Sequence, residues 1–269
     1  MSQIVIDKAS LQGKRESNED KDVVVTNITG EDKNLLPVNV YGVFDGHGGK
    51  FVSKFLADYL PHIMMSNKVS YPLKKSVAKK IFRYLQKYLK DNYSRYATET
   101  GSTCLFVAQY TGKGGDYLDI INIGDSKCIM CRKNMAIPLT KEHRPSSFEE
   151  HSRITALGGE ITQSTNDDPR IHGLSVSRSV GDLYAHPHVT PDPDLYRYRL
   201  TNDDKFIVLG CDGLYDYCTE TEIVTFVLRN CYDPVTKQRT TSKIAKKLAQ
   251  YAIDKGSTDN VSVIVVFFK

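Results

Sequence analysis

The sequence VYGVFDGHGG, Val40 to Gly49, joins a run of β-branched and aromatic residues to an aspartate and a cluster of glycines. The run is typical of a buried strand. A carboxylate at the end of such a strand is costly unless a counter-charge accompanies it, and a hard divalent metal ion is the obvious one. Because Gly46 lets the backbone approach closely, its carbonyl is a further candidate ligand.

The same arrangement recurs along the chain. Asp125 follows IINIG and Asp212 follows FIVLGC, whereas Glu19-Asp20, Asp182 and Asp259 lie beside Gly or Asn. Oxygen ligands without a His or Cys cluster favour magnesium or manganese over zinc. Two such ions can activate a shared water and hold a phosphoryl group.

Two further residues fit this chemistry. His47 is placed to protonate a leaving oxygen as general acid, and Arg15 is suited to hold a phosphate through two hydrogen bonds. Each piece also has an ordinary explanation. An Asp-Gly dipeptide is more often a turn, a lone His is more often structural, and an Arg before acids is usually a surface ion pair. These residues alone therefore indicate a magnesium or manganese hydrolase, with the ordinary readings still open.

The bulk properties predict one globular domain, residues 1–269. No linker, repeat or low-complexity tract interrupts the 269 residues, and no run approaches the roughly 20 apolar residues of a membrane span. We find no secretory signal. Of the six cysteines, Cys128 and Cys131 form a CxxC without the second pair that a zinc site needs, so core thiols are favoured. We expect a reduced, cytoplasmic protein and leave nuclear residence open.

Hydrophobic periodicity and composition predict the elements. The expected strands are Asp22–Ile28, Val38–Phe44, Thr103–Tyr110, Tyr117–Ile123, Lys127–Arg132, Lys205–Cys211 and Asn260–Phe268. The expected helices are about Gly49–Met64, Leu73–Tyr96, Phe148–Leu157, Glu220–Arg229 and Ser242–Asp254. Because strands cluster and helices come in separate blocks, we predict an α+β fold, with mainly antiparallel sheets and helices packed outside.

The positive charge is concentrated in one segment. Residues 74–95 carry eight Lys and Arg against one acid, whereas the whole chain has a net charge of only +4. Apolar residues recur there at helical spacing, so we expect a surface helix with a basic face. A solvated face is favoured over a binding patch. Docking of acidic phosphoproteins, nucleic acid or anionic lipid stays open, although no dedicated nucleic-acid motif is present.

Nine motifs follow one another in a recognisable order. They are RESNED (15–20), VFDGHGG (43–49), GST (101–103), NIGDSK (122–127), LTKEHRP (139–145), RITALGGEI (153–161), LSVSRSVGD (174–182), CDGLYD (211–216) and STDNVSVIVV (257–266). Together they resemble the metal-dependent type 2C protein serine/threonine phosphatases, also called the PPM family, and in particular the eukaryotic-type branch. The resemblance covers about residues 10 to 267.

The resemblance implies a fold and an activity. The fold is a central β-sandwich of two antiparallel sheets flanked by helical layers (α-β-β-α). The activity is hydrolysis of phosphoserine and phosphothreonine in phosphoprotein substrates. A hydroxide bridging two Mg²⁺ or Mn²⁺ ions attacks phosphorus directly, so no phosphoenzyme is expected. The family is usually monomeric.

The resemblance also implies roles for individual residues. Asp45 bridges the two metals, Glu19 and the Gly46 carbonyl serve one of them, and Asp212 and Asp259 serve the other. Arg15 binds the phosphate and His47 is the general acid. Asp20 orients metal-bound water, and Asp125 is associated, with Asp212, with a weaker third metal. Thr103, Arg178, Asp182 and Asp216 match further motif positions.

The chain departs from the family pattern at several positions. Asn18 replaces Met, Lys127 replaces Arg, Glu142 replaces Asp and Tyr215 replaces Trp. The stretch Arg170 to Arg178 is one residue shorter than usual. It adjoins the flap, roughly Gln163 to Gly173, which shapes substrate access in the family. Two other functions stay in view: a phosphatase-fold binding module without catalysis, and a hydrolase of small or nucleic-acid phosphates.

Overall fold

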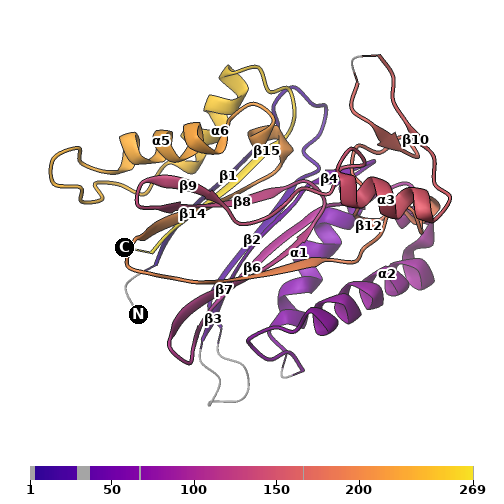
Figure 1. The fold of residues 1–269 in the computed structure, drawn as a ribbon, viewed down its shortest axis with the longest axis horizontal. Coiled ribbons are helices and arrows are strands. Elements are labelled where there is room, and N and C mark those ends of the chain that lie inside the picture. The colour runs from indigo at the N-terminus through magenta and orange to yellow at the C-terminus, as the bar shows by residue number, and fades with distance from the viewer. Residues whose placement is uncertain (1–3, 29–36, 67, 166, 269) are drawn as a thin grey trace.

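Two five-stranded antiparallel sheets lie face to face at the centre of the structure (Figure 1). The structure is a computed structural model that describes residues 4–28, 37–66, 68–165 and 167–268. The first sheet, called here the β15 sheet, has the order β1 (Val5–Leu11), β15 (Val261–Phe267), β14 (Asp204–Gly210), β8 (Lys127–Arg132) and β9 (Met135–Pro138). The second, the β6 sheet, has the order β13 (Asp194–Arg199), β7 (Gly115–Ile123), β6 (Cys104–Gly112), β3 (Val38–Phe44) and β2 (Lys21–Ile28).

Short strands extend one end of this sandwich. A three-stranded ribbon has the order β12 (Val180–Gly181), β5 (Gly101–Ser102) and β4 (Gly46–His47). A small hairpin pairs β10 (Ile161–Thr162) with β11 (Arg170–Ile171) and projects from the body of the protein (Figure 1). This hairpin contains most of the segment that the sequence analysis defines as the flap.

Helices cover both outer faces of the sandwich. Helices α1 (Phe51–Met64) and α2 (Lys75–Ala97) pack on the β6 sheet, and α4 (Asp212–Tyr215), α5 (Glu220–Cys231) and α6 (Ala245–Asp254) pack on the β15 sheet. Helix α3 (Phe148–Ala156) packs against strand β10 of the hairpin, and the 3₁₀ turn η1 (Leu183–Ala185) packs against α2. This arrangement confirms the predicted α-β-β-α sandwich.

The covered faces explain why the central strands read as continuous apolar runs. In β14, Phe206 and Val208 face the helices, whereas Ile207 and Leu209 face the other sheet. Both sets are fully buried. A strand buried on both faces needs an apolar side chain at every position, and truncating such a residue, for example Phe206→Ala, costs about 3–5 kcal/mol of stability.

The predicted elements agree with the structure to within a few residues at their ends. In the two central sheets, three strands were not predicted, β1, β9 and β13, and the two-residue strands β4, β5, β10, β11 and β12 were not predicted either. The first three lie at sheet edges: β1 and β13 carry polar residues that dilute the apolar pattern, as in DLYRYR of β13, and β9 is only four residues long. The capping box of Thr219 and Glu222 at the start of α5 is confirmed. All six cysteines are buried and unpaired, as expected of core thiols. Among the described residues, no helix combines the length and apolar character that crossing a membrane requires.

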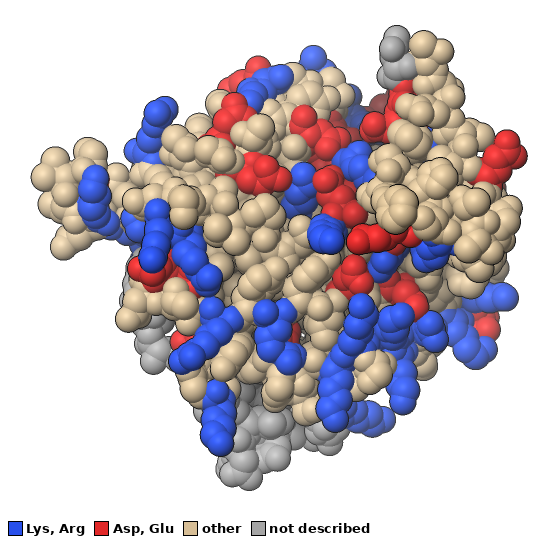
Figure 2. Space-filling view, viewed as in Figure 1, with Lys and Arg blue, Asp and Glu red and all other residues tan. Residues whose placement is uncertain are grey.

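The basic segment forms α2, as predicted, and Figure 2 shows Lys and Arg side chains gathered where this helix lies. Several of its cations have acidic partners within the molecule. Arg83 donates two hydrogen bonds of 2.8 Å to Asp192, and Lys79 donates one of 3.1 Å to the same carboxylate. Part of the basic face therefore fastens the Asp192 loop to the helix.

Candidate active site

The predicted acidic residues meet at one end of the sandwich. Asp45 follows β3, Asp125 follows β7 and Asp212 follows β14, while Glu19 and Asp259 precede β2 and β15. In antiparallel sheets the end of one strand adjoins the start of its neighbour, which is why residues so distant in sequence converge. They line a cleft of about 700 Å³. The predicted site residues along its wall are Arg15, Glu19, Asp45, Gly46, His47, Asp125, Asp212 and Asp259.

The backbone around Asp45 is fixed by Thr103. The Thr103 N–H donates to the Asp45 carbonyl (2.9 Å), and the Asp45 N–H donates to Thr103 Oγ1 (3.1 Å). Thr103 is itself buried and hydrogen-bonded to Ser126 Oγ at 3.0 Å. These hydrogen bonds fix the backbone of Asp45, and they therefore limit where its carboxylate lies in the cleft.

A second clamp is made by Asn260. Its Oδ1 accepts a hydrogen bond from the Glu19 N–H (2.8 Å), and its Nδ2 donates to the carbonyls of Gln12 (2.8 Å) and Ser17 (3.0 Å). The loop that carries Arg15 and Glu19 is thus tied to the segment that carries Asp259. Sequence reasoning quoted Asn260 within a motif but did not find this role.

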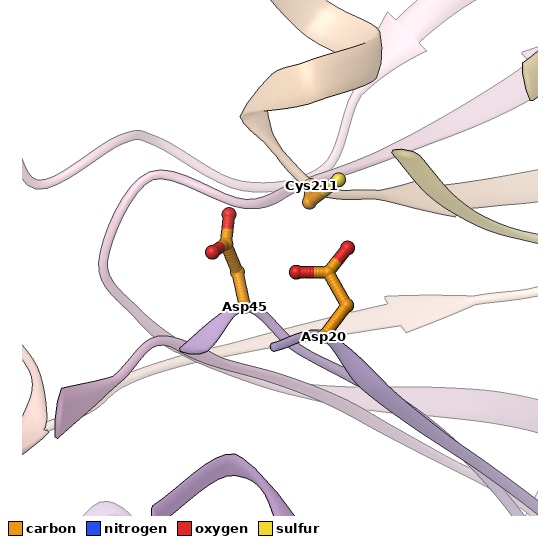
Figure 3. Close-up of side chains that lie close together, drawn as sticks. All are labelled: Asp20, Asp45 and Cys211. Atoms are coloured by element: carbon orange, nitrogen blue, oxygen red, sulfur yellow. The ribbon is translucent and has the colours of Figure 1, made fainter. Parts of the chain in front are cut away.

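Asp20 lies behind the cleft wall, close to Asp45 and Cys211. Ligand atoms of the three residues lie within 4.8 Å of one another, and Figure 3 shows both carboxylates directed into the same space. The Cys211 sulfur accepts a hydrogen bond from the Ser262 N–H at 3.2 Å and is fully buried. Burial keeps this thiol protonated, because it raises the pKa well above the usual range. The carboxylate oxygens of Asp20 and Asp45 are therefore the atoms of this group that are available to bind a metal ion.

The electrostatics of the cluster fit divalent cations. Burial, together with the charge of Asp212, raises the pKa of Asp20 to about 7 and that of Asp125 to about 8. The same causes raise the pKa of Asp45 well above its usual range, and burial followed by repulsion from Asp259 raises that of Asp212. Among the described residues, the buried oxygens Asp20 Oδ2 and Asp125 Oδ2 have no hydrogen-bond donor. Several buried carboxyls with orphaned oxygens and too little positive charge form a donor set suited to Mg²⁺ or Mn²⁺.

Comparison with known proteins agrees with this geometry. Residues 5–261 match the family model for protein phosphatase 2C. The chain belongs to the protein phosphatase 2C family. It is 37% identical over 290 residues to the integrin-linked kinase-associated serine/threonine phosphatase 2C of Bos taurus, which covers 96% of this chain and 75% of that protein. It is 32% identical over 268 residues to the probable protein phosphatase 2C 71 of Arabidopsis thaliana, with 97% and 54% covered.

Solved structures share the fold. A C. elegans sex determining protein superposes with a TM-score of 0.83 at 24% identity, covering 100% of this chain and 66% of that one. A phosphatase of Toxoplasma gondii gives 0.77 at 22% identity, covering 98% and 94%. The family and the named relatives make this chain a protein serine/threonine phosphatase, a phosphoric monoester hydrolase.

In this phosphatase, Arg15 contacts one of the predicted metal ligands. Its guanidinium donates to Asp259 Oδ2 at 2.6 Å, and this hydrogen bond is the main reason its pKa is raised. Its side chain is otherwise open to solvent at the rim of the cleft. Arg15 therefore has donors both for a carboxylate of the site and for a phosphate that enters the cleft.

His47 of the phosphatase is paired with Asp182. The His47 Nε2 and Asp182 Oδ2 atoms are 2.7 Å apart, and Asp182 also accepts a hydrogen bond from Ser179. Burial alone would lower the pKa of His47, but the charge of Asp182 outweighs it and the pKa is raised. Asp182 thus favours the protonated form of His47, the form that a general acid requires. The sequence analysis matches Asp182 to a motif position without indicating this contact.

The pair is packed against Gly101. A Cβ atom on that residue would lie 2.1 Å from Asp182 Oδ2 and 2.5 Å from His47 Nε2, so no larger residue fits without moving one of them. The glycine in the GST motif is therefore required by the close approach of the two side chains. The sequence offered the motif as its only signal of this requirement.

The flap forms part of the cleft wall through Arg170 and Gly173, and the adjoining residues Leu174 to Val176 continue that wall. The shortened stretch Arg170–Arg178 is accommodated by a tight turn, in which Ile171 and Leu174 exchange backbone hydrogen bonds and His172 has a positive φ of 53°. Arg178 still reaches the buried Glu150 with two hydrogen bonds, of 2.9 and 2.5 Å. Arg178, at the end of the shortened stretch, is therefore anchored to the body of the protein.

Proposed function

We propose that the cleft binds two divalent cations, Mg²⁺ or Mn²⁺, and hydrolyses phosphoserine and phosphothreonine in phosphoproteins. Asp45 would contact both ions, Glu19 and the Gly46 carbonyl would hold one, and Asp212 and Asp259 would hold the other. The convergence of these carboxylates in one cleft, with raised pKa values at Asp45 and Asp212, supports the assignment. When bound, such ions supply an activated water and positive charge against the phosphoryl group.

The remaining chemistry belongs to side chains of the chain itself. Arg15 binds the non-bridging oxygens of the phosphate, exchanging its hydrogen bond with Asp259 for hydrogen bonds to the substrate. His47 donates a proton to the departing seryl or threonyl oxygen, which is a poor leaving group without one. Before the transfer, Asp182 stabilises the positive charge of the protonated imidazole, and Asp20 accepts a hydrogen bond from water in the cleft.

The first experiment measures hydrolysis of a phosphothreonine peptide by the purified protein with Mn²⁺, with Mg²⁺ and with EDTA. We expect phosphate release that depends on the cation and falls at least about a thousandfold in Asp45→Asn. The Asp58→Asn variant, a half-exposed aspartate on α1, is the matched control and should retain activity. Release that persists in EDTA would refute the two-cation proposal.

The alternative functions predict other outcomes in the same assay. A folded protein that binds Mn²⁺ yet releases no phosphate would support a binding module without catalysis. Faster release from a nucleotide than from the phosphothreonine peptide would support a small-phosphate hydrolase. A phosphotyrosine peptide tests selectivity for the two alkyl esters.

The docking role of the basic helix stays a prediction. Because Lys79 and Arg83 already contact Asp192, their neutralisation would disturb the fold as well as a surface. Lys80, which borders a separate apolar groove between α1 and α2, allows a cleaner test. A loss of activity in Lys80→Gln on a phosphoprotein, but not on a small chromogenic ester, would support docking, and equal effects on both would count against it.

A further inference from the structure

Arg144 lies at the edge of the acidic cluster and contacts four carboxylates. Its guanidinium donates hydrogen bonds to Asp216 Oδ1 at 2.8 Å, to Glu142 Oε1 at 3.2 Å and to Asp168 Oδ2 at 3.4 Å. It also lies 3.3 Å from Asp125 Oδ2, the buried oxygen without a hydrogen-bond donor. The Arg144 side chain thus connects Asp125, on the cleft wall, with the three other carboxylates.

The setting of Arg144 is that of a fixed internal cation. Only 16% of its side chain is exposed, so its charge is shielded from solvent. Burial alone would lower its pKa, but the charges of Asp125, Asp216 and Glu142 raise it further above its usual range. A guanidinium offers several donors in one plane, which suits simultaneous contact with several carboxylates better than an ammonium group does.

Three departures from the family pattern form a chain of contacts that begins at Arg144. Glu142, which is one methylene longer than the usual Asp, contacts Arg144 and also lies 3.1 Å from Lys127 Nζ. The Lys127 ammonium in turn lies over the ring of Tyr215, 5.4 Å from its centroid. The unusual residues of this chain are therefore neighbours, and Glu142 connects them to the Arg144 guanidinium.

The fourth contact of Arg144 leads to the flap. Asp168 belongs to the flap, and its side chain is 66% exposed. Its contact with Arg144 connects the flap to the acidic cluster. Asp125 and Asp216, by contrast, belong to the body of the protein. Arg144 therefore joins a projecting hairpin to the floor of the cleft.

We infer that Arg144 takes the place of an additional divalent cation between Asp125 and Asp216, and that it holds the flap over the cleft through Asp168. The inference rests on the two-cation site of the proposed function, whose ligands Arg144 leaves free. Its consequence is that the chain binds two cations without a third, because the guanidinium already lies 3.3 Å from Asp125 Oδ2 and 2.8 Å from Asp216 Oδ1, the carboxylates that a third would need.

The test compares cation binding and flap opening in wild type, Arg144→Gln and Arg132→Gln. Arg132 pairs with the buried Asp204 at the far end of β8, so its variant controls for loss of a buried ion pair away from the cleft. In calorimetric titration with Mn²⁺ alone, we expect Arg144→Gln to bind one more ion per chain than wild type. The extra ion should be lost again in Arg144→Gln/Asp125→Asn, and Arg132→Gln should match wild type.

Hydrogen exchange reports the second half of the inference. Amides of Gln163–Thr165 and Asp167–Gly173 should exchange roughly two- to fivefold faster in Arg144→Gln, the effect of losing one partly exposed ion pair. Equal Mn²⁺ counts in wild type and Arg144→Gln overturn the cation role, and equal flap exchange overturns the coupling. If Arg144→Gln fails to fold, Arg144→Lys decides. The lysine should keep the wild-type Mn²⁺ count and speed flap exchange, and any other result rejects the inference.

These readouts separate the inference from the proposed function. Neither requires turnover, so an inactive protein can still be examined. Wild type that binds no Mn²⁺ contradicts the proposed function, whereas the flap exchange of Arg144→Gln still decides the role of Arg144 in holding the flap.

Discussion

Asp20 and Glu150 are buried to the same extent, each with 3% of its surface exposed, yet their pKa values move in opposite directions. Burial raises the pKa of Asp20 to about 7, and the neighbouring carboxylates add to the effect. Burial also acts to raise the pKa of Glu150, but the guanidinium groups of Arg178 and Arg153 reverse it and lower the pKa to about 2. At equal burial, the charges of the neighbouring side chains therefore decide whether the pKa of the carboxyl is raised or lowered.

The comparison separates a structural carboxylate from a functional one. Glu150 accepts hydrogen bonds from Arg178, from Arg153 at 2.8 Å and from Ser177 at 2.8 Å, so its charge is compensated within the fold. Asp20 keeps one oxygen without a donor among the described residues. A buried carboxylate whose charge is compensated holds segments of the fold together, whereas one whose charge is not compensated is available to a ligand of opposite charge.

The largest effect on stability is expected from Glu150→Gln. The variant leaves two guanidinium groups without their shared carboxylate, which costs about 3–5 kcal/mol of the free energy of unfolding. Because the pKa of Glu150 is lowered on folding, its contribution is complete above the unfolded pKa and is lost as pH falls toward about 2. Urea denaturation between pH 7 and pH 3 measures both effects. The adjacent Glu149→Gln, on a side chain 75% exposed, is the control. A variant as stable as wild type at pH 7 would contradict the comparison.

Asp20→Asn should act in the opposite direction. In EDTA at pH 8 we expect it to raise the free energy of unfolding by about 1–4 kcal/mol, because it removes an uncompensated buried charge. Since the pKa of Asp20 is raised on folding, the penalty is absent below the unfolded pKa and grows as pH rises through about 7. The gain should therefore vanish near pH 4. Thermal unfolding in EDTA at the two pH values checks this. Loss of stability at pH 8 would mean that Asp20 is compensated after all.

The strands and the site residues could be read from sequence to different depths. Strands such as β3, β8 and β14 were predicted because burial on both faces imposes unbroken apolar runs. Edge strands such as β13 were missed because their polar side chains find partners in tertiary structure, as Arg197 does with Asp119 at 2.6 and 2.9 Å. Such pairing leaves no periodic pattern in the sequence.

The same limit applies within the cleft. The motifs nominated Asp45, Asp212 and His47, and the structure brings them to one cleft. Their individual roles stay predictions. The sequence did not indicate that Asp182 pairs with His47 or that Arg144 contacts Asp125, because these contacts join residues 135 and 19 positions apart. A motif records which residues are kept together in order, and only the fold decides which side chains touch.

The smallest effect is expected from a third kind of buried carboxylate, Asp182, which is paired with a histidine. Asp182→Asn should lower activity on a phosphothreonine peptide about tenfold at pH 7.5, a fraction of what general acid catalysis contributes. The variant lowers the pKa of His47, because the charge that raises it is removed. The fall of kcat at alkaline pH should therefore begin at lower pH. Nitrophenyl phosphate, whose leaving group departs without a proton, should be affected less.

Gly101→Ala provides the independent check on that pair, since it leaves both charges in place and separates them by steric contact. It should reproduce the shifted alkaline limb and the difference between the two substrates. A shift in Asp182→Asn that Gly101→Ala fails to reproduce would assign the effect to the net charge of the cleft. If kcat falls over the same alkaline pH range in wild type and in both variants, His47 does not donate the proton. In that case Asp182 would belong with Glu150, as a carboxylate that only stabilises the fold.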